Sequence, residues 1–138
     1  MATIQYKGVN ELQNGEAENL QSRQPFKPKI MALYLTRFSY TPETWTRLIK
    51  NPEDRREAAR KYIESVGGKL HGFWYAFGAY DGYNLWEAPD NVSMAAVVIA
   101  ISGGGALSKC ETTLLLTVEE TLNALSRAEA VAYRPPGA

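Results

Sequence analysis

The sequence predicts an α+β fold, a ferredoxin-like βαββαβ sheet followed by an extra C-terminal helix. Strand-like and helix-like segments alternate in the order of the split β-α-β arrangement. Glycine clusters and proline-containing start signals separate these segments. The chain has 138 residues, of which 45 % are apolar, and this is enough for one domain with a single core.

The first strand is expected over residues 30–38, where aliphatic, aromatic and β-branched residues lie between two prolines. A helix is expected next, because Thr41 is a favoured N-cap and Pro42 suits the first helical turn. The same type of start signal recurs at Pro52, which predicts a break and a second helical segment over residues 52–66. The apolar residues of this segment form one buried stripe at helical spacing: Ala58, Ala59, Tyr62, Ile63 and Val66.

Further strands are expected over residues 69–77, 83–87 and 107–116, each bounded by glycine-containing turns. A helix over residues 92–101 connects the last two strands, with Asp90 and Asn91 as its capping residues. Thr117 and Glu120 have the spacing of a capping box, which predicts the extra helix up to about residue 130.

Residues 1–29 differ from the rest of the chain. Gln, Asn, Glu and Lys dominate there, and the apolar residues show no sustained strand or helix period. We interpret this segment as an N-terminal arm, either a mobile tail or a segment that packs on a neighbouring subunit. The domain is therefore expected over residues 30–130, with a short extended tail over residues 131–138.

The composition argues against several classes of partner. Fifteen basic residues balance fifteen acidic ones, so the net charge does not favour nucleic acid or an anionic membrane. Cys110 is the only cysteine, and together with the single histidine it makes no recognisable ligand set, so neither a metal site nor another cofactor is expected. The sequence shows neither the pattern of a signal peptide nor an apolar run long enough to span a bilayer, so we expect a cytoplasmic protein.

Several short motifs occur in a fixed order along the chain. They are residues 52–55, residues 67–69, Gly78 with Tyr80 and Asp81, residues 88–90, and a glycine turn before the last strand. Together they resemble the GYD domain family over about residues 30–125. The resemblance implies a ferredoxin-like fold whose open sheet faces pair to form a dimeric α+β barrel. No catalytic role is established for the family's Gly, Tyr and Asp, so the resemblance implies only a structural role for them.

Three polar residues are candidates for catalysis: His71, Tyr75 and Asp81. With strict alternation along their strand, His71 and Tyr75 share one face, where a histidine could act as a general acid or base. The alternative for His71 is a surface position near the start of the strand. Asp81 lies in a turn, where it could bond nearby backbone N–H groups or, alternatively, serve as a catalytic carboxylate.

Six residues are candidates for ligand binding: Tyr34, Thr36, Phe38, Phe73, Asn84 and Trp86. In the first strand the aliphatic residues Leu33 and Leu35 alternate with a second set, which consists of Tyr34, Thr36 and Phe38. We expect the aliphatic set to face the helices and the aromatic set to face the barrel interior. An aromatic pocket with a few polar groups is typical of a small-molecule site. A plain dimer interface is the alternative, because Tyr and Trp are enriched there too.

The sequence thus predicts a small-molecule-binding domain or a cofactor-independent enzyme of unknown substrate. Its ligand would be small and apolar or aromatic, and the protein would be a homo-oligomer built from dimers. The alternative is a non-catalytic assembly module in which the N-terminal arm reaches a neighbouring subunit.

Overall fold

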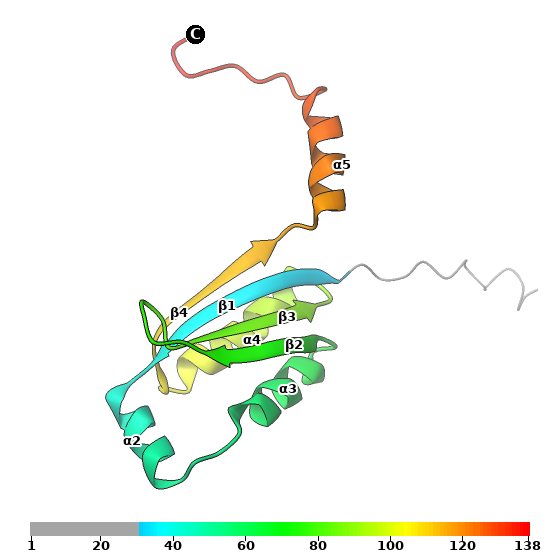
Figure 1. Ribbon diagram of the computed structural model, residues 1–138. Coiled ribbons are helices and arrows are strands. Elements are labelled where there is room, and N and C mark those ends of the chain that lie inside the picture. The colour runs from blue at the N-terminus through cyan, green and yellow to red at the C-terminus, as the bar shows by residue number, and fades with distance from the viewer. Residues whose placement is uncertain (1–30) are drawn as a thin grey trace, which may run out of the picture.

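Four strands form one antiparallel sheet in the order β2-β3-β1-β4 (Figure 1). The computed structural model describes residues 31–138, so the N-terminal arm lies outside the described residues. The strands are β1 (Ala32–Tyr40), β2 (Lys69–Tyr75), β3 (Gly82–Ala88) and β4 (Leu107–Leu115). This order, with β1 and β3 in the centre, is that of a ferredoxin-like sheet, and it confirms the predicted fold class.

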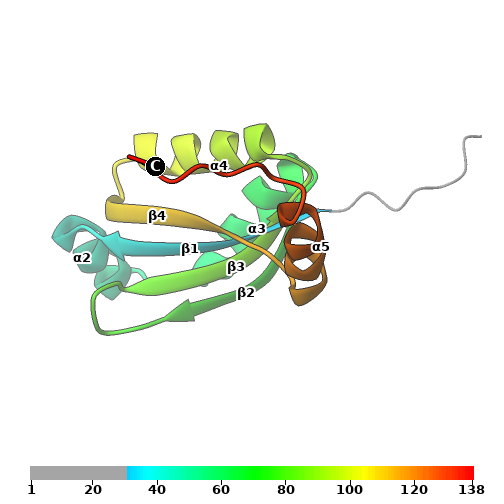
Figure 2. The same cartoon turned by 90° about the horizontal axis from the view of Figure 1, so that it is seen from above.

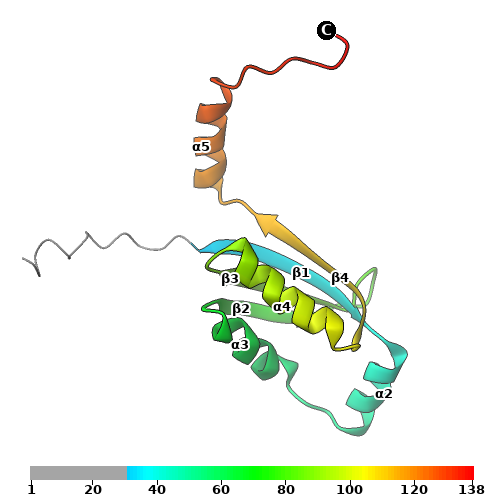
Figure 3. The same cartoon turned by 180° about the vertical axis from the view of Figure 1, so that it is seen from behind.

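Two helices cover one face of the sheet. They are α3 (Arg55–Ser65) and α4 (Asn91–Gly103), which lie on the same side of the strands (Figures 2 and 3). The short helix α2 (Pro42–Lys50) lies beyond the end of β1 rather than over the sheet. Helix α5 (Val118–Ala128) projects from the end of β4, away from the sheet and the other helices. Within the described residues, no helix covers the opposite face, which we call the open face.

Local start signals determine where the helices begin. The side chains of Thr41, Asp90 and Thr117 each accept a backbone N–H of the first turn, and Glu120 completes the predicted capping box. In α3 the cap is Asp54, so this helix begins later than predicted. These polar contacts satisfy N–H groups that have no partner within their own helix.

The core lies between the sheet and the helices α3 and α4. Tyr34 of β1 and Trp86 of β3 are almost completely buried there, with their rings 5.3 Å apart. They pack with Ile63 of α3 and Val97 of α4. The aromatic side chains of the central strands therefore face the helices.

The expected assignment of the faces of β1 was wrong. Leu33 and its aliphatic neighbours lie on the open face, where they are only half-buried. Aromatic residues fit the helix-covered face because their polar groups find partners there. The Tyr34 hydroxyl donates to Asn91 Oδ1 at 2.7 Å, and Trp86 Nε1 donates to Thr36 Oγ1 at 2.9 Å.

A β-bulge changes the alternation of β2. The pairing with β3 shifts between Leu70 and Gly72, so His71 is displaced onto the open face. There its Nε2 lies 3.0 Å from Glu87 Oε1. The expectation that His71 shares a face with Tyr75 was wrong, because it assumed strict alternation and one extra residue reverses the orientation.

Candidate functional site

A cavity of about 230 Å³ lies between the helix-covered face of the sheet and the helices α3 and α4. Residues of all four strands line it, together with residues of α3, of α4 and of the turn that follows α4. Four of the six predicted ligand-binding residues line it: Thr36, Phe38, Phe73 and Asn84. The other two, Tyr34 and Trp86, fill the neighbouring core instead.

Asn84 lines the cavity and carries a buried acceptor. This residue is only 6 % exposed, and its Oδ1 has no hydrogen-bond partner among the described residues. Thr36 lies opposite Asn84 in the strand register, but its hydroxyl already bonds Trp86 Nε1 and Thr112 Oγ1. A buried acceptor without a partner costs about 1–3 kcal/mol, so native proteins usually supply one from water or a ligand.

Aromatic rings form the apolar part of the cavity. The rings of Phe38 and Phe73 meet edge to face at 5.5 Å between centroids, and Phe38 also lies 5.2 Å from the ring of Tyr40. Gly82 makes room for this arrangement, because a Cβ at that position would lie 2.2 Å from Phe38 Cζ. The aromatic wall is therefore held in place by close packing against the β3 backbone.

Arg55 and two tyrosines bring polar groups to the cavity. Among the described residues that line it, Arg55 alone carries a charge, and its Nη1 donates to Glu53 Oε1 at 3.0 Å. Burial raises the pKa of Tyr62, and burial together with the Tyr75 hydroxyl at 3.3 Å raises the pKa of Tyr40 far above its ordinary value. Both hydroxyls therefore stay protonated near neutral pH and can donate hydrogen bonds.

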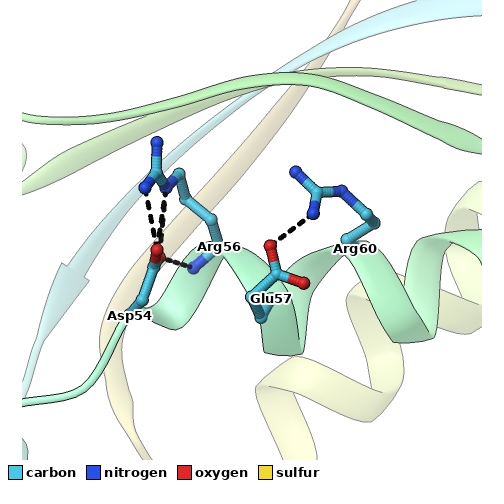
Figure 4. A network of polar contacts seen from close by, with 4 residues as sticks. All are labelled: Asp54, Arg56, Glu57 and Arg60. Carbon is cyan, nitrogen blue, oxygen red and sulfur yellow. Dashed lines mark hydrogen bonds and ion pairs between the residues drawn. The ribbon is translucent and has the colours of Figure 1, made fainter.

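Two ion pairs in the first turns of α3 and at its N-cap lie outside the cavity. Arg56 Nη2 lies 2.8 Å from Asp54 Oδ2, and Arg60 pairs with Glu57 (Figure 4). All four side chains are exposed, as expected for the solvated face of a helix.

Asp81 connects the turn between β2 and β3 to β1 and to α2 through hydrogen bonds. Its Oδ2 accepts the backbone N–H of Tyr40 at 2.9 Å and the indole N–H of Trp45 at 3.2 Å. Its own backbone N–H donates to Phe38 O at 2.8 Å. The carboxylate thereby anchors the turn between β2 and β3 to the end of β1 and to α2.

The three candidate catalytic residues are not gathered in one place. His71 lies on the open face beside Glu87, whereas Tyr75 meets Tyr40 on the helix-covered side. Asp81 reaches the backbone of Tyr40 rather than its hydroxyl. A catalytic unit of these three side chains is therefore not assembled within the described structure.

Sequence reasoning missed Tyr40, Arg55 and Tyr62 as cavity residues. A signal for Tyr40 was present, because β1 continues the aromatic alternation two residues beyond its expected end at residue 38. Tyr62 was assigned to the buried stripe of its helix, which is the face that meets the cavity. Arg55 stands in a run of charged residues (53–57), a pattern typical of a solvated helix face, and only the packing of α3 shows that it differs from Arg56.

Comparison with protein families matches the GYD domain over residues 34–125. This chain belongs to the GYD domain family. Among curated proteins, none matches it. Solved structures that resemble this GYD domain include MtbAldR, with 11 % identity and a TM-score of 0.43, covering 78 % of this chain and 69 % of that chain. Two proteins from Burkholderia xenovorans are also similar. The first, an uncharacterized NIPSNAP-like domain protein, has 14 % identity and a TM-score of 0.42, and the match covers 78 % of this chain and 91 % of that chain. The second, an uncharacterized NIPSNAP domain protein, has 16 % identity and a TM-score of 0.40, and the match covers 64 % of this chain and 95 % of that chain.

Gly78, Tyr80 and Asp81, on which the resemblance to the family partly rests, lie in the turn between β2 and β3. Asp81 anchors this turn to β1, whereas Tyr80 reaches the open face. There the guanidinium of Arg37 lies 4.9 Å from the centre of the Tyr80 ring, and Lys109 Nζ lies 5.2 Å from it. Both residues of the motif therefore stabilise the fold in this GYD domain.

Other kinds of site find little support in the described part of the GYD domain. Between residues 31 and 138, no group of three or more His, Cys, Asp or Glu side chains gathers as a metal ion would require. None of the helices in this range has the length and apolar character needed to cross a membrane. Burial raises the pKa of the Cys110 thiol, which keeps it protonated and weakly nucleophilic near neutral pH.

Proposed function

We propose that this GYD domain binds a small molecule in the cavity between the sheet and the helices α3 and α4. The observation that carries this proposal is Asn84, a residue that lines a cavity with aromatic walls and whose buried Oδ1 has no described partner. Ligand sites are typically apolar hollows with a few polar groups that fix orientation. Tyr40, Tyr62 and Arg55 supply such groups around the same space.

Binding is better supported than catalysis. Asp81 is engaged in holding a turn, and His71 lies on the other face of the sheet. The described cavity wall offers hydroxyl, amide and guanidinium groups but neither a carboxylate nor an imidazole. A cofactor-independent reaction in this cavity would therefore depend on Tyr40 and on the neighbouring Tyr75 as proton donors.

Native mass spectrometry of the full-length protein, purified gently from its own host, tests the proposal. We expect a reproducible extra mass that is retained by the wild type and lost in Asn84→Leu. Asn123→Leu on the exposed helix α5 is the matched control and should keep the extra mass. A wild-type protein that carries no small molecule, and binds none from a fragment library, would contradict the proposal.

A second proposed function is homo-oligomeric assembly through the open face, as in a dimeric α+β barrel. This face presents Leu33, Leu35 and Leu85 half-buried, and Trp74 is 54 % exposed there. Contiguous apolar surface of this kind usually marks an interaction site. We also propose a cytoplasmic location, because a lone thiol such as that of Cys110 stays reduced in that compartment.

The N-terminal arm belongs to this second proposal, on the basis of its sequence alone. If the arm packs on a neighbouring subunit, deletion of residues 1–28 should lower the oligomeric state measured by light scattering. An unchanged mass after this deletion would remove the arm from the assembly.

A further inference from the structure

The polar groups of the cavity differ in kind between its inner part and its outer part. Asn84, almost completely buried, offers a hydrogen-bond acceptor at the sheet. Arg55, at the start of α3, also lines two neighbouring surface hollows, so it marks the place where the cavity opens to solvent. A ligand that satisfies both must therefore carry a donor at its inner end and an acceptor at its outer end.

The outer end favours a negative charge. A guanidinium has five N–H donors in a planar fork, and Arg55 uses one of them on Glu53. Both members of that pair are well exposed, with 36 % and 57 % of their side-chain surface accessible, so the pair is weak and a ligand carboxylate can share the guanidinium. The protonated hydroxyls of Tyr40 and Tyr62 lie near Arg55 and add donors for the same anion.

The middle of the cavity favours a flat apolar body. Phe38 and Phe73 form one wall, and Ile101 and Leu107 contribute aliphatic surface. The volume of about 230 Å³ lies below the range of about 300–1,000 Å³ typical of drug-sized ligands. The space therefore suits a single ring rather than a nucleotide or a fused ring system.

From these features we propose that the ligand is a single-ring aromatic carboxylate with a hydroxyl or amino donor opposite the carboxylate. The carboxylate binds Arg55, the ring packs against the wall formed by Phe38 and Phe73, and the donor bonds Asn84 Oδ1. This inference rests on the proposed binding function of the cavity, and it adds the chemical class of the ligand.

Titration of the full-length protein with three probes tests the inference. The probes are 4-hydroxybenzoate, benzoate without the donor, and phenol without the carboxylate, with binding followed by amide shifts in NMR spectra. We expect 4-hydroxybenzoate to bind about tenfold more tightly than either of the others, because each loses one hydrogen bond to a charged or buried group. Equal affinity for phenol and 4-hydroxybenzoate would overturn the assignment of an anion.

Variants separate the two ends of the ligand. Arg55→Gln should weaken the binding of 4-hydroxybenzoate and of benzoate about tenfold and leave the affinity for phenol unchanged. Arg55→Lys should retain part of the affinity for the two carboxylates. The control Arg60→Gln on the same helix should leave the affinities for all three probes unchanged. Asn84→Leu should abolish the advantage of 4-hydroxybenzoate over benzoate. If no probe binds, the ligand class is wrong. The retained mass in the native spectrum then decides separately whether the cavity binds another molecule or whether the binding function fails as well.

Discussion

At the scale of single residues, the cavity combines groups that would be costly in a plain core. Asn84 Oδ1 is buried without a described partner, and the hydroxyls of Tyr40 and Tyr62 are removed from most of the solvent. A core selected only for stability would replace such groups with apolar ones, since buried polar groups contribute little unless they are fully satisfied. Their presence together around one space is the pattern expected if stability has been exchanged for recognition, as the proposed binding function requires.

Replacing Asn84 tests this exchange through the free energy of unfolding. Asn84→Leu removes the unsatisfied acceptor and keeps a similar side-chain volume, so we expect the ligand-free protein to gain about 1–3 kcal/mol. Urea unfolding of ligand-free wild type and variant measures the difference. The control Asn123→Leu should leave stability unchanged within about 0.5 kcal/mol. A marked loss of stability in Asn84→Leu would show that the amide has partners that its environment in the cavity does not reveal.

Tyr40 gives a pH prediction. Its pKa is raised in the folded protein above the ordinary value of 10.0, first by burial and then by the hydrogen bond with Tyr75. The unfolded chain therefore loses the Tyr40 proton more readily than the folded one, and stability should fall as the pH rises above about 10. Urea midpoints measured from neutral to alkaline pH should fall less steeply in Tyr40→Phe than in the wild type. The exposed control Tyr133→Phe should follow the wild type, and identical slopes in all three proteins would mean that the Tyr40 hydroxyl titrates freely.

At the scale of elements, the helix caps could be predicted from the sequence, whereas the faces of the strands and their pairing in the sheet could not. The caps at Thr41, Asp90 and Thr117 depend on residues a few positions apart, and the structure confirms them. The face of β1 depends on which side chains fill the space beneath α3 and α4, and the bulge at His71 depends on the pairing of β2 with β3. Neither can be inferred from one strand alone. For this reason the four cavity residues that were predicted from the sequence, Thr36, Phe38, Phe73 and Asn84, were assigned to the wrong side of the sheet.

Helix α5 is the element whose stability needs explanation. It has 11 residues and stands apart from the sheet, yet isolated helices shorter than about 12–15 residues are marginal in water. Val118, Leu122 and Leu125 lie on one face of it and are 59–71 % exposed. An amphipathic helix of this kind becomes stable when its apolar face packs against another surface.

We expect a second copy of the chain to provide that surface. Leu122→Glu should therefore lower the oligomeric mass measured by light scattering, while the near-UV circular dichroism of the buried aromatic side chains in the core stays unchanged. Ala124→Glu adds the same charge on the opposite side of α5 and should leave the mass unchanged. If Leu122→Glu has no effect on mass, α5 takes no part in assembly.

At the scale of the whole molecule, the sheet separates two surfaces with different proposed roles. The helix-covered face contains the cavity, and the open face presents aliphatic residues with Trp74 at one edge. Because the two faces are distinct, ligand binding and assembly can be altered independently. A binding domain and an assembly module, the two alternatives that the sequence leaves open, are thus compatible in one chain, since the two proposed roles would use opposite sides of the same strands.

The independence of the two faces can be tested at Leu35, which lies between Leu85 and Thr113 in the centre of the open face. Leu35→Lys places a charge in the proposed interface, and its desolvation should prevent the faces from pairing, so the mass should fall to that of a monomer. Val92→Lys on α4, where the native side chain is 80 % exposed, is the matched control and should keep the oligomer. Because the cavity lies on the other side of the sheet, Leu35→Lys should still retain the ligand mass in the native spectrum. Loss of both the oligomer and the ligand in a variant that remains folded would show instead that the cavity is completed only by assembly.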